Sequence, residues 1–209
     1  KDRKKHITCF YPQRWKYLKD YNVTIKCTPL QYYDLISNDI DYWKRQAMKN
    51  KFFKNKWLHL CGERLKWLSD KKTKFLLELD NKLKNERVLL FCNSIEQTEV
   101  LGNCINSKFK SSLTTLEDFN KGKINQISAV NMLNEGCNLV NCRIGIYGNL
   151  NSSEIIVKQR LGRILRHKDP IIIIPYYKNT REEELVEKML EDYNPKLIKT
   201  INNIEEITL

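Results

Sequence analysis

From Arg87 onward, short runs of apolar residues alternate with segments of helical pattern, and this alternation limits the folds open to the chain. The apolar runs are 88–91, 127–130, 144–147 and 171–174. Each run is almost entirely apolar, which is typical of strands buried on both faces. Such strands, separated by helices, predict an α/β fold with a mostly parallel sheet flanked by helices. In a sheet of this kind, functional side chains gather at the carboxyl ends of the strands.

Capping residues mark where helices begin among these strands. Ser94 is predicted to cap a helix that runs to about Ile105. Thr180 and Glu183 form a capping box that opens a helix reaching about Tyr193.

Residues 30–84 have a helical pattern, with apolar side chains recurring every three or four positions. Thr28-Pro29 is predicted to open this region and Ser69-Asp70 to interrupt it, while 23–27 alternates like a strand. Basic residues are interleaved with aromatic ones, which could bind nucleic acid by charge and stacking. Aromatic residues at helical spacing are more often core residues, so both interpretations stay open. The aromatic residues concerned are Trp43, Phe52, Phe53, Trp57 and Trp67.

The net charge of +12 is confined to the first part of the chain. Residues 1–87 hold 22 Lys and Arg against 10 Asp and Glu, whereas residues 88–209 hold 15 of each. A basic segment beside a neutral one indicates a polyanionic partner, most simply nucleic acid. The alternative is a Lys-rich composition of the kind an AT-rich genome produces.

The seven cysteines are odd in number and contain no CxxC pair, and no histidine lies near Cys137 and Cys142. We therefore expect reduced thiols, no metal site and a cytoplasmic location. No apolar run approaches the roughly 18 residues of a transmembrane helix, so no membrane partner is expected. Because the chain starts with Lys1, we expect it to be a fragment of a longer protein.

A predicted helix over 152–166 carries a distinctive polar face. At 100° per residue, Gln159, Arg163 and Arg166 lie within about 60° of one another, opposite an apolar face. Gly162 lies beside this face, at a cost of about 1 kcal/mol relative to alanine, and would allow close approach of a ligand. Guanidinium forks of this kind suit a transferring phosphoryl group. The alternative is an ordinary amphipathic helix with a solvated basic face.

Three segments occur in an informative order: 87–94 (RVLLFCNS), 129–138 (AVNMLNEGCN) and 159–166 (QRLGRILR). Together they resemble motifs four, five and six of the second RecA-like domain of superfamily two helicases and translocases. The likeness covers roughly residues 87–193 and is of the excision-repair or restriction type.

The resemblance implies a role for each matched residue. Arg163 and Arg166 match arginine fingers that reach the γ-phosphate of ATP bound to the partner domain. Gln159 matches a residue that helps couple this helix to the nucleotide and to the other domain. Gly136 lies at the turn of the middle motif, where the backbone approaches nucleotide or nucleic acid. Asn138 stands where the family usually has an Asp that orients nucleotide or an arginine. Asn138 can still accept a hydrogen bond but lacks the negative charge.

The resemblance also implies a nucleic-acid track. Ser94 matches a phosphate contact at the end of a strand, and Asn131, with Glu135, resembles the excision-repair form of the middle motif, which favours DNA. Three simpler interpretations stay open: Ser94 as a helix cap, Gly136 as a helix C-cap and Asn138 as a turn residue.

The chain lacks the phosphate-binding half of an ATP site. Its one Gly-Lys pair, Gly122-Lys123, is followed by Ile124 rather than Ser or Thr. We therefore expect ATP with Mg²⁺ to be held mainly by an N-terminal RecA-like domain of the same protein. The prediction is the C-terminal motor domain of an ATP-dependent DNA helicase or translocase, with DNA repair as its setting, inactive as an ATPase alone. The alternatives are a non-catalytic nucleic-acid-binding module and a duplex translocase that does not unwind.

The predicted organisation has four parts. Residues 1–30 end a preceding domain, and 31–86 form a basic helical connector. Residues 87–194 form the RecA-like domain, and 195–209 form a C-terminal tail.

Overall fold

The computed structural model describes residues 7–9, 25–27, 29–106, 111–130, 139–150 and 167–209. The chain divides into two compact units, Lys1–Arg64 and Leu65–Leu209, which are treated separately below. Among the described residues, no helix combines the length and the apolar character needed to span a bilayer.

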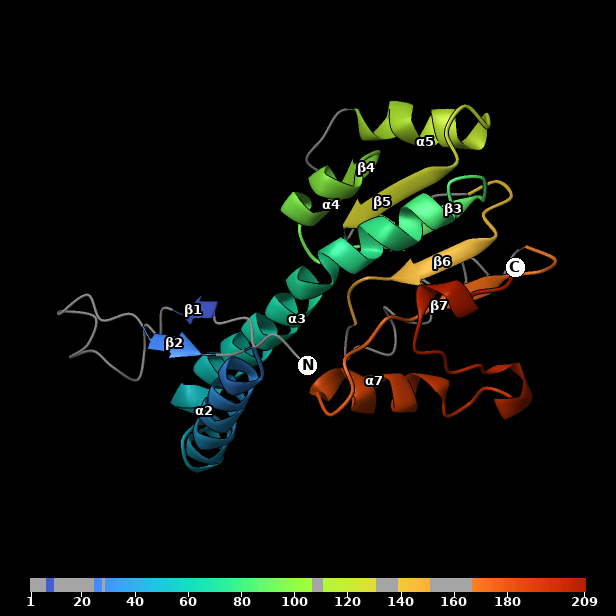
Figure 1. Cartoon of the computed structure of the whole chain (residues 1–209). Helices are drawn as coiled ribbons and strands as arrows, with labels where there is room; N and C mark the ends of the chain where they lie inside the picture. Colours follow the sequence, from blue (N-terminus) through green and yellow to red (C-terminus); the bar gives the residue numbers. More distant parts are fainter. Residues whose placement is uncertain (1–6, 10–24, 28, 107–110, 131–138, 151–166) are drawn as a thin grey trace. The chain divides into compact units, whose positions relative to one another are not determined.

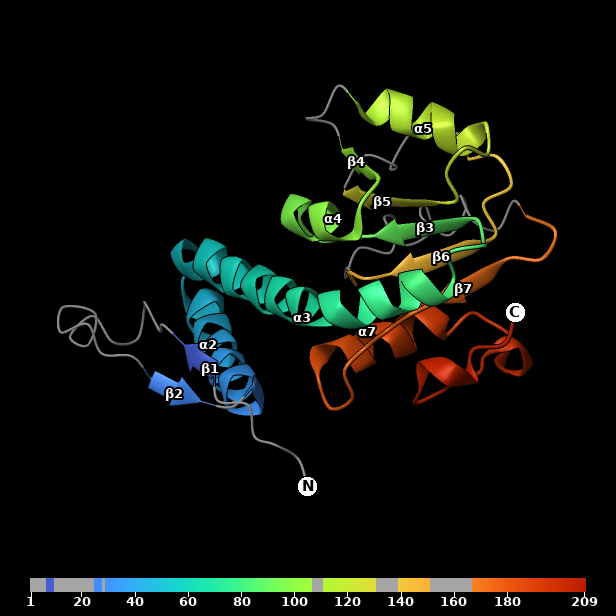
Figure 2. The ribbon, with the colours of Figure 1, turned by 45° about the horizontal axis from the view of Figure 1, so that its top comes forward.

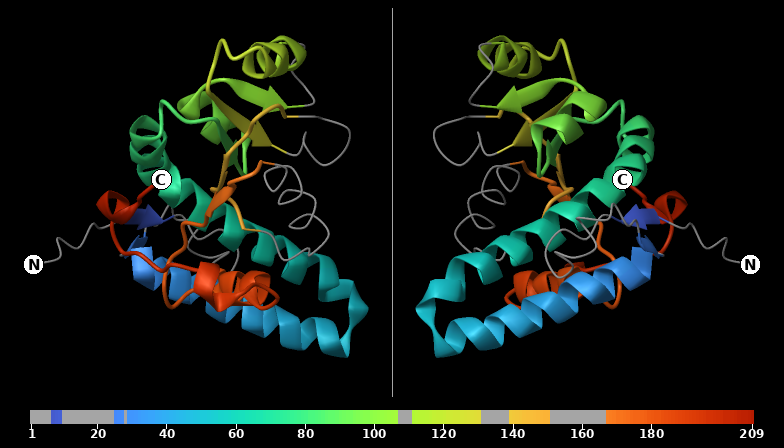
Figure 3. Two further views of the ribbon diagram at one scale, coloured as in Figure 1. Left: turned by 90° about the vertical axis from the view of Figure 1, so that its right-hand side faces the viewer. Right: turned by 90° about the vertical axis from the view of Figure 1, so that its left-hand side faces the viewer.

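The first unit contains a small sheet and a helical hairpin. Strands β1 (Ile7–Cys9) and β2 (Ile25–Cys27) pair antiparallel. Helix α2 (Pro29–Lys49) is followed by the 3-10 turn η1 (Lys51–Phe53) and by α3 (Lys54–Lys82), whose first part runs back beside α2 (Figure 3). The predicted helix start at Pro29 is confirmed.

The predicted break at Ser69-Asp70 is wrong, because α3 continues through it to Lys82. A serine inside a helix competes for backbone hydrogen bonds only when its hydroxyl has no better partner. Here the Ser69 side chain is buried and donates to the carbonyl of Gly148, 3.0 Å away. A tertiary contact therefore satisfies the hydroxyl and leaves the helix intact.

The second unit is built on a five-stranded sheet (Figure 1). All its neighbouring strands pair parallel, in the order β4-β5-β3-β6-β7. The strands are β3 (Val88–Phe91), β4 (Cys104–Asn106), β5 (Gln126–Val130), β6 (Ile144–Tyr147) and β7 (Ile171–Ile173). The helices are α4 (Ile95–Leu101), α5 (Ser112–Asn120) and α7 (Arg181–Leu190), followed by the 3-10 turns η3 (Pro195–Leu197) and η4 (Ile204–Glu206).

The predicted α/β class with a mostly parallel sheet is confirmed, but strand β4 was not predicted. The expected helix from Ser94 to Ile105 ends at Leu101, because Gly102 and Asn103 have positive φ values of 83° and 45°. Left-handed residues stop a helix. The chain then pairs Cys104 with Ser128 of β5.

Apolar side chains cover both faces of the sheet, as the all-apolar strands predict. Successive residues of β3 point to opposite faces. Leu89 packs in a cluster with Phe119 of α5 and Leu185 of α7. Leu90 packs in a second cluster with Leu76 and Leu79 of α3. Figure 2 shows the C-terminal part of α3, which belongs to the second unit, along one side of the sheet.

Candidate functional site

Three connecting segments leave the sheet at its carboxyl edge. Residues 92–94 follow β3, 131–138 follow β5, and 148–150 follow β6 and lead into 151–166. Because β3 lies between β5 and β6 and all three are parallel, these segments start side by side. The crevice at the carboxyl ends of such strands is where α/β sheets bind ligands. This edge is therefore the candidate site.

Six of the predicted site residues lie outside the described part of the chain. They are Asn131, Gly136, Asn138, Gln159, Arg163 and Arg166. The structure describes the ends of strands β5 and β6, which precede the segments that contain these residues. The roles of the six residues stay predictions.

Ser94 is described, and it caps helix α4. Its backbone is extended, and its hydroxyl accepts a hydrogen bond from the backbone N–H of Gln97, 3.2 Å away. The helix-cap interpretation of Ser94 is therefore confirmed. A phosphate contact at the same side chain stays a prediction.

Gln97 holds the segment after β3 against helix α3. Its side-chain oxygen accepts from the backbone N–H of Asn93 at 3.0 Å and, at 3.2 Å, shares the single hydroxyl proton of Ser69 with the Gly148 carbonyl. Its amide nitrogen donates to the Ser69 carbonyl at 3.0 Å and to the Thr73 hydroxyl at 3.1 Å. Gln97 is almost fully buried, so these bonds replace those it would make with water. Sequence reasoning missed this residue, because nothing local distinguishes it from a surface glutamine.

Hydrogen bonds to α3 and β3 also hold the end of β6 in place. The Gly148 carbonyl accepts from Ser69, and the Asn149 backbone N–H donates to the Phe91 carbonyl at 3.1 Å. A Cβ placed on Gly148 would lie 2.9 Å from that Phe91 oxygen and 2.8 Å from Cδ1 of Leu76. A glycine is therefore needed for β6 to leave the sheet this close to β3.

A buried ion pair holds the segment after β7. The Lys72 ammonium donates to the Glu182 carboxylate at 2.6 Å and to the Pro175 carbonyl at 3.1 Å. The second carboxylate oxygen of Glu182 accepts from the Tyr177 backbone N–H at 3.2 Å. Burial lowers the pKa of Lys72, and the charge and hydrogen bond of Glu182 oppose that shift. A signal for this pair was present in the sequence, since Lys72 lies within the apolar stripe of α3.

These contacts make α3 the common support of the candidate edge. Ser69 and Lys72 lie on the buried side of α3 and contact the segments that follow β6 and β7, while Gln97 ties α3 to the segment after β3. Displacing any one of these segments would leave a buried polar group of α3 or Gln97 without its partner, which costs free energy.

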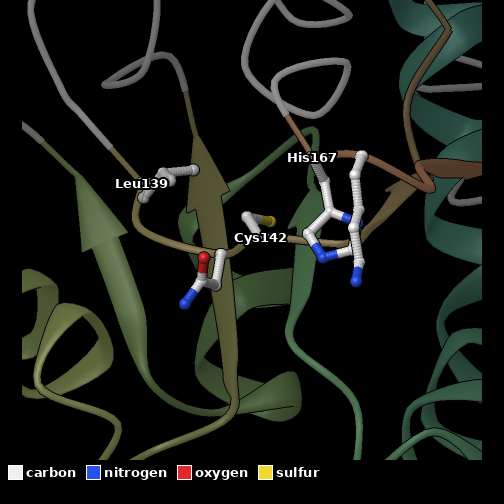
Figure 4. Close-up of a pocket in the computed structure, with 5 residues that line it drawn as sticks. Leu139, Cys142 and His167 are labelled. Carbon is white, nitrogen blue, oxygen red and sulfur yellow. The ribbon is translucent and has the colours of Figure 1, made fainter.

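A cavity of about 280 Å³ lies at the opposite edge of the sheet (Figure 4). Its lining residues precede β6 and β7: Leu139, Asn141, Cys142, His167 and Lys168. Burial raises the pKa of the Cys142 thiol to about 12, so this cysteine is protonated at neutral pH and is not an activated nucleophile. The cavity is separate from the candidate edge.

Residues 71–168 match the family model described as the helicase conserved C-terminal domain. The matched range encloses all three segments singled out in the sequence. No curated protein matches the chain significantly.

Solved structures with a similar chain trace include two helicases. One is Dbp5 of S. cerevisiae bound to RNA and ADP BeF3, with 14% identity, a TM-score of 0.49, and coverage of 59% of this chain and 36% of that one. Another is the Hef helicase domain of Pyrococcus furiosus, with 18% identity, a TM-score of 0.42, and coverage of 76% and 37%. The chain thus spans a little over a third of these structures.

Proposed function

We propose that this chain, which carries a helicase conserved C-terminal domain over residues 71–168, is the C-terminal motor domain of an ATP-dependent helicase or translocase. The family match carries the proposal. It is supported by the parallel sheet, because the segments that hold the family motifs depart from neighbouring strands at one edge.

In this proposal, Arg163 and Arg166 act as arginine fingers. Their guanidinium groups neutralise the charge that develops on the γ-phosphoryl group during its transfer. ATP, the substrate, is bound with Mg²⁺ mainly by an N-terminal RecA-like domain of the same protein. Gln159 couples the finger helix to the nucleotide, and Gly136 lets the backbone approach it. Asn138 orients neighbouring groups by hydrogen bonds alone, since it lacks the carboxylate usual at that position.

The same edge forms part of a nucleic-acid track. Ser94 and Asn131 contact the strand, with Ser94 lying at the N-terminus of α4, where a backbone phosphate is favoured. We favour DNA because Asn131 and Glu135 resemble the excision-repair form of their motif. ATP binding closes the cleft between the two RecA-like domains, and hydrolysis reopens it, which moves the strand.

ATP turnover by the full-length protein tests the fingers. We expect Arg163→Ala and Arg166→Ala each to lower nucleic-acid-stimulated turnover by about 10³-fold or more, with ATP binding largely retained. Arg181→Ala is the matched control, because this arginine is exposed on α7 beyond the family match and pairs with Glu184. Unchanged turnover in both finger variants would contradict the assignment.

ATP turnover, measured together with nucleic-acid binding and strand separation by the same protein, distinguishes the alternatives. Nucleic-acid binding without turnover in the wild-type protein would favour a non-catalytic binding module. Turnover stimulated by blunt duplex, without strand separation, would favour a duplex translocase. Stronger stimulation by RNA than by DNA would overturn the preference for DNA.

A further inference from the structure

The helical hairpin of the first unit ends in an unusually basic tip, which we define as residues 42–58. Between Asp41 and Glu63 the sequence contains no acidic residue. It contains six basic ones on both sides of the turn: Lys44, Arg45, Lys49, Lys51, Lys54 and Lys56. The hairpin tip lies wholly outside the helicase match, which begins at residue 71.

The basic side chains of the hairpin tip are largely exposed, and only Lys56 among them lies over an aromatic ring of the described residues, that of Trp43. Five of the six basic residues are exposed, and Lys56 is partly exposed. Within the described part of the chain, none of the ion pairs involves any of the six. Uncompensated charge concentrated in a short segment attracts a polyanion.

Aromatic packing gives the hairpin tip a defined shape. The Trp43 ring lies 5.4 Å from the Phe53 ring, and the Lys56 ammonium lies 3.7 Å from the centre of the Trp43 ring. Asn50 caps the turn, because its side-chain oxygen accepts from the Phe52 backbone N–H at 2.9 Å. The turn is therefore held by packing and by a cap.

Phe52 does not join this packing as a core residue. Its side chain is 81% exposed, although its ring touches that of Phe53 edge-on at 5.4 Å. An aromatic ring held in solvent by a capped turn, with lysines on both sides of it, matches the way single-stranded nucleic acid is bound: bases stack on rings while cations contact phosphates.

We propose that the hairpin tip is a second nucleic-acid contact, in which the lysines and Arg45 contact backbone phosphates and Phe52 stacks on an unpaired base. The inference rests on the proposed function for the identity of the polyanion, and it adds a binding surface outside the helicase domain. An acidic membrane fits less well, because an interfacial helix needs a continuous apolar face. The exposed large apolar side chains of the hairpin tip are Tyr42, Met48, Phe52 and Leu58, and exposed basic residues are interspersed among them in the sequence.

Fluorescence anisotropy of labelled oligonucleotides with the 209-residue chain tests the proposal. The probes are a mixed-sequence single strand of about 20 nucleotides and the matching blunt duplex. The charge variant is Lys49→Gln/Lys51→Gln/Lys54→Gln. Its control, Lys178→Gln/Lys196→Gln/Lys199→Gln, removes three exposed lysines of the second unit. The stacking variant is Phe52→Ala, and its control is Leu197→Ala, since Leu197 is also 81% exposed.

We expect the charge variant to bind the single strand about 10-fold more weakly or worse and to reduce the slope of log K against log salt by about 2. Phe52→Ala is expected to weaken single-strand binding by about 5-fold or more and to leave duplex binding nearly unchanged. Both controls should bind like the wild type. Circular dichroism melting of every variant verifies that the fold is retained.

Each outcome decides between named possibilities. Wild-type binding that neither variant weakens would overturn the hairpin contact and leave the proposed motor untouched, since the finger assay does not involve these residues. Weaker binding by the charge variant alone would overturn the stacking of Phe52. Binding to phosphatidylserine vesicles without binding to either oligonucleotide would overturn the hairpin contact in favour of a membrane surface.

Discussion

The Lys72 ammonium and the Glu182 carboxylate lie 2.6 Å apart, and both side chains are buried although 110 residues separate them in the sequence. The pair joins α3 to the start of α7 beside the segment that follows β7. Two charges removed from water are stable only while they stay together. The pair therefore fixes where α7 starts relative to α3.

Removing one partner of the ion pair should lower the free energy of unfolding far more than removing both charges. We expect Lys72→Met to lower the free energy of unfolding by about 3–5 kcal/mol, because it leaves Glu182 charged and buried. Lys72→Met/Glu182→Gln should recover most of that loss, since glutamine is neutral and can still accept from Tyr177. Urea unfolding of the four proteins of this cycle measures the coupling. Additive losses would show that the two side chains act independently.

Substitution by alanine is expected to have opposite effects on stability at two glycines. Gly148→Ala should destabilise the protein by about 1–3 kcal/mol, because the new methyl would overlap the Phe91 carbonyl, which is backbone and cannot easily move. Gly62→Ala in the exposed part of α3 should be neutral or stabilising by up to about 1 kcal/mol, since nothing lies within 4 Å of the added atom. Thermal melting compares them, and equal effects would contradict the close approach at Gly148.

Asp80 should make the protein less stable as the pH rises. Partial burial on α3 raises its pKa from 3.8 to about 6, and one carboxylate oxygen is buried without a hydrogen-bond partner among the described residues. Because the folded-state pKa is above the unfolded value, the native state binds more protons across that window. The free energy of unfolding therefore falls as pH rises from about 4 to about 6.

Asp80→Asn should accordingly stabilise the protein at about pH 7.5, by no more than about 1 kcal/mol because the side chain is partly solvated. At about pH 4 the variant should match the wild type. Asp41→Asn, at an exposed position of α2, is the control. Urea unfolding across this pH range gives the measurement, and an equal gain at both ends would rule out titration of Asp80 as the cause.

Substitutions of Ser94 can separate its confirmed role from its predicted one. Ser94→Ala should cost about 1 kcal/mol of stability through the lost cap. Ser94→Asp keeps a capping oxygen at the positive end of α4, so its stability should stay close to that of the wild type. If Ser94 also contacts a phosphate, the added carboxylate should weaken nucleic-acid binding measured by anisotropy. Full binding by Ser94→Asp would leave Ser94 as a cap alone.

The strands and most helix starts could be predicted because their signals are local. The all-apolar runs at 88–91 and 144–147 became β3 and β6, and Thr180 caps α7 as its position indicates. The capping box differs in two details. The Thr180 hydroxyl accepts from the backbone N–H of Glu182 rather than Glu183, and the Glu183 carboxylate accepts from the backbone N–H of Asn179 rather than Thr180. Strand β4 was missed because three residues after a left-handed turn carry little pattern of their own.

The sequence by itself determined the fold class and the resemblance to a helicase C-terminal domain. Both depend on short-range features, namely the period of apolar residues and the order of three motif segments, which do not require knowing what packs against them. Only the tertiary structure decided that α3 continues through Ser69, that Gln97 binds it to the segment after β3, and that Lys72 pairs with Glu182. Each of these depends on a partner distant in sequence, because a buried polar group is stable only where another element supplies its hydrogen bond.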